Sequence, residues 1–110
     1  MITVRNLMTL ERFLLEIENR FKFQLRFAEV IELYGFLKEV GKITNLFFML
    51  QEEHAKKYGD KEALKEYHDK LIDDEVSLNT SKMVAFVKDI SNRFYDEEFA
   101  DIITKNQFWD

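Results

Sequence analysis

Cysteine and proline are absent from the 110-residue sequence, and glycine occurs only at positions 35, 41 and 59. Without cysteine, the chain cannot form a disulfide, bind zinc through thiolates or use a cysteine nucleophile. Because small secreted domains commonly depend on disulfides, we expect an intracellular, cytoplasmic protein. The scarcity of glycine and proline also removes the usual interruptions of helices, so the sequence favours long, continuous helices.

A long hydrophobic run and a secretory signal are also missing. The longest apolar run is residues 46–50, whereas a helix that crosses a bilayer needs roughly 18 apolar residues. Residues 1–5 do not show the basic segment and apolar stretch that are typical of a signal peptide. We therefore expect no membrane partner.

Catalytic and metal-binding motifs are lacking as well. Hydrolase elbows, phosphate-binding loops and dinucleotide fingerprints require glycines at spacings that this sequence does not provide. The two histidines, His54 and His68, match no known metal motif, and we interpret them as ordinary surface or packing residues. We expect neither enzymatic activity nor a metal or other cofactor.

What the sequence does contain is an abundance of apolar residues in helical spacing. Hydrophobic residues make up 46% of the chain and phenylalanine occurs 11 times, which suffices for one core but not for two domains at this length. The repeat of three or four residues predicts helices over about 10–20, over 27–58 and over about 61–72. Two shorter helices follow, one containing Met83 to Phe94 and one containing Phe99 to Ile103. We predict a single, mainly α domain over residues 1–110, with a long central helix and short C-terminal helices.

Four positions carry cap residues that predict where these helices begin. Thr9 precedes the first helix, Asp60 the third, Thr80 or Ser81 the fourth and Asp96 the fifth. Their side-chain oxygens can accept hydrogen bonds from the free N–H groups of a first helical turn.

A helical hairpin is predicted across the turn at residues 58–60. Late cations followed by Gly59 are typical of a helix end, and a short connection places consecutive helices antiparallel. After the hairpin, residues 75–79 alternate like a short strand, which could pair with residues 2–4 in a minimal two-stranded sheet. We predict hairpin contacts of Tyr67 and Leu71 with Phe47, Leu50 and His54.

Three local structures stay open at this level. Residues 21–27 alternate apolar and polar as a strand would, yet they could equally form a helical turn or an extended connection. As one helix, residues 27–58 would be about 48 Å long, whereas a compact domain of this size has a radius of gyration near 13 Å. This helix therefore either breaks at Gly35 or Gly41 or protrudes. Residues 108–109 either dock on the domain or stay loose.

The long helix carries apolar residues on two faces. The first stripe comprises Leu33, Phe36, Val40, Ile43, Phe47, Leu50 and His54, and the second comprises Phe27, Val30, Ile31, Tyr34 and Leu37. A helix that is apolar on two faces needs more than one neighbour. The second stripe is therefore either covered by the other helices or left open for a partner or for self-association. We take as candidate partner-binding residues Phe27, Ile31, Tyr34 and Leu37.

The net charge of −5 is concentrated in the second half of the chain. Residues 1–59 hold 9 Lys and Arg against 8 Asp and Glu, whereas residues 60–110 hold 7 against 13. This balance argues against direct nucleic-acid binding, which requires a basic face. The cations near the N-terminus that a nucleic-acid site would use are Arg12, Arg20, Lys22 and Arg26. No DNA-recognition helix can be identified beside this basic patch. As a candidate acidic face for a protein partner we take Asp73, Asp74, Glu75, Asp96, Glu97, Glu98 and Asp101.

The order of features over about residues 10–78 resembles uncharacterised small helical proteins of phages and prophages of Gram-positive bacteria. The shared markers are a long helix that ends in the turn Lys57-Tyr58-Gly59, a shorter return helix that ends in Leu71-Ile72-Asp73-Asp74, and the strand-like segment Glu75-Val76-Ser77-Leu78. The resemblance implies a phage origin. It ends after Leu78, where this sequence shows an amphipathic helix instead of a further extended segment.

These observations lead to two hypotheses of function. The first is a non-enzymatic interaction factor, phage-encoded, that binds and inhibits a host protein such as a CRISPR nuclease or another defence nuclease. In that version the acidic residues would occupy a basic nucleic-acid channel of the target. The alternative is a phage structural or assembly subunit that oligomerises through its long helix.

Overall fold

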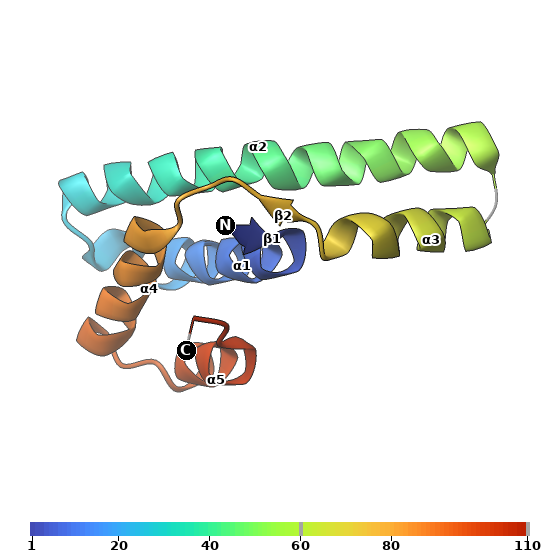
Figure 1. The fold of residues 1–110 in the computed structure, drawn as a ribbon. Helices are drawn as coiled ribbons and strands as arrows, with labels where there is room; N and C mark the ends of the chain where they lie inside the picture. The colour runs from blue at the N-terminus through green and yellow to red at the C-terminus, as the bar shows by residue number, and fades with distance from the viewer. Residues whose placement is uncertain (60, 110) are drawn as a thin grey trace.

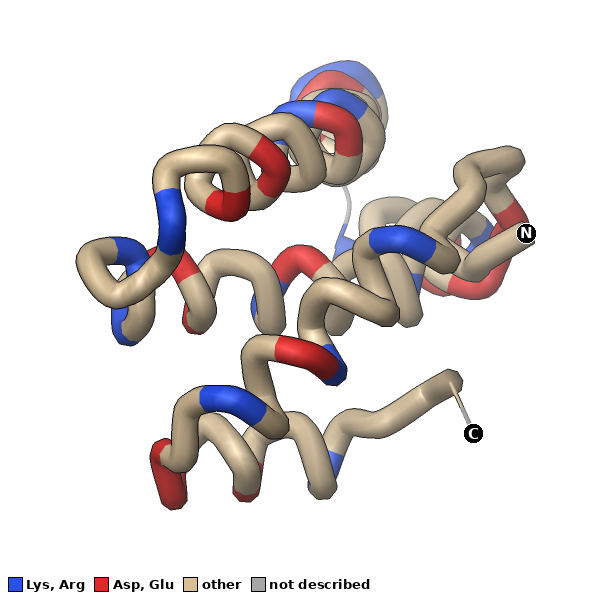
Figure 2. Tube along the Cα trace, turned by 90° about the vertical axis from the view of Figure 1, so that its left-hand side faces the viewer, with Lys and Arg blue, Asp and Glu red and all other residues tan. Residues whose placement is uncertain are grey.

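The computed structural model describes residues 1–59 and 61–109, and over these residues the chain is mainly helical. Its elements are β1 (Ile2–Thr3), α1 (Val4–Phe21), the 3-10 helix η1 (Lys22–Gln24), α2 (Phe27–Tyr58), α3 (Lys61–Ile72), β2 (Glu75–Val76), α4 (Ser81–Arg93) and α5 (Glu97–Asn106). Figure 1 shows α1 in the centre, with α2 along one side, α5 on the opposite side and α4 crossing near one end. The view turned by 90° likewise places α5 and α2 on opposite sides (Figure 2). No helix of the described residues is long and apolar enough to span a membrane.

Helix α1 is the centre of the core because it buries one side along its whole length. Its buried residues recur every three or four positions, with one adjacent pair at 13–14, and they are Val4, Leu7, Leu10, Phe13, Leu14, Ile17 and Phe21. The helix starts at Val4 and not near residue 10, so our prediction of a cap at Thr9 is wrong. Thr3 caps the helix instead, and its hydroxyl accepts a hydrogen bond from the Asn6 N–H at 3.2 Å. The burial of Val4 and Leu7 continues the apolar spacing one and a half turns upstream of the predicted start.

The predicted pairing of the chain start with the segment after α3 is confirmed. Strand β1 pairs with β2 in antiparallel orientation, with Ile2 opposite Val76 and Thr3 opposite Glu75. The Val4 N–H then donates to the Asp74 carbonyl at 3.0 Å. This short sheet fixes the first residue of α1 against the end of α3.

Helix α2 is continuous over 32 residues, so neither Gly35 nor Gly41 breaks it. The molecule is correspondingly elongated, with principal extents of 47 × 26 × 23 Å. Of the two alternatives from the sequence, the protruding helix is the one adopted, and Figure 1 shows the α2/α3 hairpin extending beyond the other helices. The short segment before α2 is a helical turn, because residues 22–24 form η1.

The predicted hairpin contacts of Tyr67 with His54 and of Leu71 with the cluster around Phe47 are confirmed. The rings of His54 and Tyr67 stack with centroids 4.4 Å apart, and Phe47 lies 5.7 Å from the His68 ring. Leu71 packs against a small cluster that contains Phe47. Gly59 ends α2 in the left-handed conformation (φ 60°), and its N–H donates to Ala55 at 2.8 Å. The predicted cap at Asp60 lies outside the described residues.

Two hydrophobic clusters hold the elements together. The larger one joins α1, α2, α4 and α5, and the smaller one consists of Val4, Phe47 and Ile72 with partly buried neighbours. Phe108 and Trp109 dock on the larger cluster, where the Trp109 ring meets Phe13 edge-on at 5.5 Å. The small cluster therefore attaches the second half of α2 and the end of α3 to the start of α1.

Candidate interaction surfaces

An apolar patch lies at the start of α2. Phe27, Ile31 and Tyr34 are 79%, 58% and 43% exposed, and their spacing of four and three residues places them on one face of the helix. We refer to these three residues as the apolar patch. Phe23, in the preceding turn, is 96% exposed. Isolated exposed apolar residues are ordinary, but large ones grouped on one face are typical of interaction sites.

Leu37 does not belong to this patch. It is partly buried and packs against the larger hydrophobic cluster. The physical reason is its position four residues after Leu33 and three before Val40, both of which are fully buried, so that it shares their face of the helix. Of the four candidate partner-binding residues of α2, Leu37 is therefore the one that packs against the hydrophobic core of this chain.

The backbone beneath the apolar patch is firmly anchored. The Glu29 carboxylate accepts a hydrogen bond from the Arg26 N–H at 3.0 Å and pairs with the Arg93 side chain of α4. The hydrogen bond from the Arg26 backbone, followed by the interaction with Arg93, lowers the pKa of Glu29 below its ordinary value. On the patch itself, the Tyr34 hydroxyl donates to Glu18 of α1 at 3.0 Å. The exposed rings thus stand on a helix that is tied to two neighbours.

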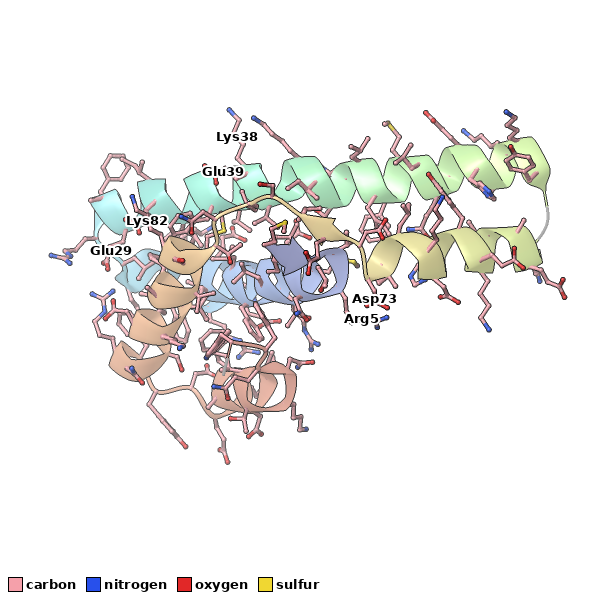
Figure 3. The ribbon with its side chains drawn as sticks, viewed as in Figure 1. Arg5, Glu29, Lys38, Glu39, Asp73 and Lys82 are labelled. Atoms are coloured by element: carbon pink, nitrogen blue, oxygen red, sulfur yellow. The ribbon has the colours of Figure 1, made fainter. Side chains whose placement is uncertain are left out.

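The candidate acidic residues fall into two groups on different elements. Asp73, Asp74 and Glu75 lie at the junction of α3 and β2, and the other four lie at the start of α5, which Figure 1 shows on another side of α1. In the first group, Asp73 pairs with Arg5 at 2.9 Å (Figure 3). Hydrogen bonding to Arg5 lowers the pKa of Asp73 and raises that of Arg5.

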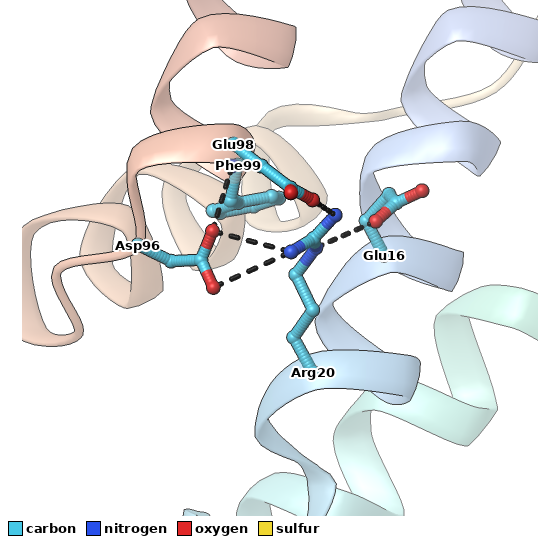
Figure 4. Close-up of polar contacts among 5 residues, drawn as sticks. All are labelled: Glu16, Arg20, Asp96, Glu98 and Phe99. Carbon is cyan, nitrogen blue, oxygen red and sulfur yellow. Dashed lines mark hydrogen bonds and ion pairs between the residues drawn. The ribbon is translucent and has the colours of Figure 1, made fainter.

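Two residues of the second acidic group, Asp96 and Glu98, contact the same arginine (Figure 4). Arg20 of α1 contacts Glu16 at 2.7 Å, Asp96 at 3.2 Å and Glu98 at 2.9 Å. Asp96 also caps α5 as predicted, since its carboxylate accepts the Phe99 N–H at 2.9 Å. That backbone hydrogen bond and then the charge of Arg20 lower the pKa of Asp96, while the carboxylates raise the pKa of Arg20. The group attaches α5 to α1, so part of the predicted acidic face serves the fold.

The histidines lie on the two helices of the hairpin and contact aromatic rings. His54 stacks on Tyr67 and its ring centroid is 4.6 Å from that of Tyr58. His68 lies next to Phe47 and 3.2 Å from the Asp69 carboxylate. Within the described residues, no three metal-ligating side chains come together.

Sequence reasoning missed a second exposed apolar group farther along α2. Leu46, Phe48 and Met49 are about half exposed, although they belong to the longest apolar run of the sequence. Beside Leu46, an apolar hollow of about 240 Å³ opens between α2, the end of α3 and β2. These residues differ from Phe47 in their angular position on α2, because Phe47 is the buried residue of the run.

Comparison with known proteins gives no further assignment: no family model matches the chain, and no curated protein or solved structure shows significant similarity to it.

Proposed function

We propose that this chain is a non-enzymatic interaction factor that binds another protein through the apolar patch. The observation that carries this proposal is the exposure of Phe27, Ile31 and Tyr34 on one face of an anchored helix. Large aromatic and aliphatic side chains supply most of the binding energy in protein interfaces. A rigid patch also loses little conformational entropy on binding.

The identity of the partner rests on the resemblance to phage proteins. On that basis we propose a host protein as the partner, with a defence nuclease such as a CRISPR nuclease as one candidate. Imitation of nucleic acid by the acidic residues has less support than the apolar patch, because Asp73, Asp96 and Glu98 are engaged by arginines. Paired carboxylates present less net charge to a basic channel.

The proposal is tested with a charged variant of the patch. Phe27→Glu/Ile31→Glu should keep the helical far-UV spectrum, because both side chains are exposed, and should lose the partner that the wild-type chain captures from host lysate. Charges in an interface must be desolvated, whereas charges on a free surface are tolerated. Leu15→Glu is the matched control, since Leu15 is 47% exposed on α1; this variant should retain the partner. Equal capture by the wild type and by Phe27→Glu/Ile31→Glu would contradict the proposal.

A second candidate function, a phage structural or assembly subunit, is favoured by the exposed outer side of the long α2. Light scattering after size-exclusion chromatography separates the two functions. A large oligomer whose size does not depend on concentration supports an assembly subunit, and a monomer or dimer supports the interaction factor.

A further inference from the structure

The outer side of α2 carries a continuous stripe of exposed residues beyond the apolar patch. It follows steps of three and four residues, and all of its members are exposed. We refer to it as the outer stripe, and its members from the patch onward are Tyr34, Lys38, Lys42, Asn45, Met49, Glu52 and Lys56. The opposite side of α2 holds the buried residues Leu33, Val40 and Phe47. Figure 3 shows Lys38 pointing away from α1 and α4, with no other element on that side.

The charges of the outer stripe are separated along the helix. Lys38 and Lys42 precede Asn45, and Glu52 follows it. Lys38 and Glu52 are 14 residues apart, about 21 Å along the helix, so they cannot pair within one molecule. Neither of them makes an ion pair within the described part of the chain, although several other surface charges do.

We propose that the outer stripe binds the outer stripe of a second copy, in antiparallel orientation about a two-fold axis at Asn45. In this arrangement Lys38 lies opposite Glu52 of the other copy, and the symmetry creates this pair twice. Lys42 lies opposite Met49, where its aliphatic stem can cover the thioether. At the ends, Lys56 lies over the Tyr34 ring, a favourable cation–π arrangement.

The charge pattern selects this register over its neighbours. An axis at Lys42 would place Lys42 against itself. An axis between Asn45 and Met49 would bring Lys42 to Glu52 but would also bring Lys38 to Lys56. An axis between Lys42 and Asn45 would leave no lysine opposite Glu52. Because facing like charges disfavour an alignment and facing opposite charges favour it, the register centred on Asn45 is preferred.

This dimer goes beyond the proposed function because it covers Tyr34 of the apolar patch but leaves Phe27 and Ile31 of both copies free for a partner. The paired segment from Tyr34 to Lys56 covers about 33 Å of helix. Ile31 lies 14 residues from the axis, so the two copies of this residue are roughly 42 Å apart along the paired helices. A dimer of this kind could engage two sites of an oligomeric partner at once.

Charge reversal tests the proposal in the full-length chain by analytical ultracentrifugation over a concentration series. The wild type should dimerise, and Lys38→Glu and Glu52→Lys should each weaken self-association by roughly tenfold or more, since like charges then face each other twice. An equimolar mixture of the two variants should dimerise again, because both facing pairs become attractive in the mixed dimer. Lys82→Glu on α4, another exposed lysine without an ion pair in the described residues, should behave as the wild type.

The absence of native cysteine allows a direct test of the axis. Asn45→Cys should form an intermolecular disulfide under mild oxidation, whereas Lys82→Cys should not, because a disulfide requires Cα atoms within about 7 Å. The proposal is overturned by a wild type that stays monomeric, by single variants that dimerise as strongly as the wild type, or by a mixture that stays monomeric. Phe27→Glu/Ile31→Glu should still dimerise, so a failure of this proposal is distinguishable from a failure of partner binding through the patch.

Discussion

The adjacent pair Phe47 and Phe48 provides a sharp test of how the hairpin is held, because the two residues differ mainly in direction. Phe47 is 4% exposed and packs between Val4 and Ile72, whereas Phe48 is 51% exposed. Replacing a buried phenylalanine by alanine typically costs ~3–5 kcal/mol. The apolar hollow next to Phe47 means that part of its surface already lacks neighbours, so we expect the lower end, about 3 kcal/mol.

For Phe48→Ala we expect a loss of about 1 kcal/mol or less. Complete burial of a phenylalanine side chain contributes roughly 1.5–3 kcal/mol, and only about half of this side chain is covered. The difference between the two variants is then about 2 kcal/mol. With a urea m-value of roughly 1–3 kcal/mol/M, this difference separates their unfolding midpoints by about 1 M.

Urea denaturation followed by far-UV circular dichroism and by Trp109 fluorescence measures this difference and also locates it. Trp109 docks on the larger hydrophobic cluster, whereas Phe47 belongs to the smaller one. If Phe47→Ala lets α3 and the second half of α2 unfold before the rest, ellipticity should change at lower urea than fluorescence, because coincident transitions require a single cooperative unit. Equal losses for Phe47→Ala and Phe48→Ala would refute the assignment of Phe47 to the attachment of the hairpin.

Three further predictions concern single contacts. Gly59→Ala should destabilise the chain by about 1 kcal/mol, because only glycine readily adopts the left-handed φ of 60°. Gly35→Ala should instead stabilise the chain by about 0.5–1 kcal/mol, since nothing lies within 4 Å of the added Cβ. Thermal denaturation shows whether the melting temperature falls in the first variant and rises in the second. The pKa of Asp96 is lowered in the folded chain, so its contribution to stability is complete above the pKa of the unfolded chain and is lost as the pH falls through the lower pKa of the folded chain. The melting temperature should therefore fall below about pH 4. In Asp96→Asn this acid-induced fall in melting temperature should be smaller. Replacing His54 and His68 with Gln should leave the metal content unchanged in elemental analysis, because neither has ligands at metal spacing; stoichiometric zinc that disappears in the double variant would contradict this.

Sequence periodicity predicted the helix boundaries correctly where one local signal marks the boundary. The bounds of α2 and α3 coincide with the apolar repeat because late cations and Gly59 mark the turn between them. The start of α1 was missed because Thr3 and Thr9 are equally good caps by local chemistry. What decides between them is the pairing of Thr3 with Glu75, a contact between residues 72 positions apart that no local pattern reveals.

The candidate acidic face illustrates a different limit. Clustered carboxylates in a sequence look like a free charged surface, but their partners can come from anywhere in the chain. Arg20 reaches Asp96 and Glu98 across 76 and 78 positions, and Arg5 reaches Asp73 across 68. In the sequence we read Arg20 as part of a basic patch, and only the packing of α5 against α1 brings it to these acids.

Exposure alone does not make the apolar patch a binding surface, since a loosely held helix end could expose the same residues by fraying. The start of α2 is not loosely held: Glu29 ties it to the backbone of Arg26 and to Arg93, and Tyr34 is tied to Glu18. Ordering of a mobile segment would cost free energy on binding, and a segment that is ordered beforehand avoids that cost. The polar anchors therefore fix the backbone that carries Phe27 and the hydroxyl of Tyr34, while both rings stay exposed. This combination favours association with a partner over local rearrangement.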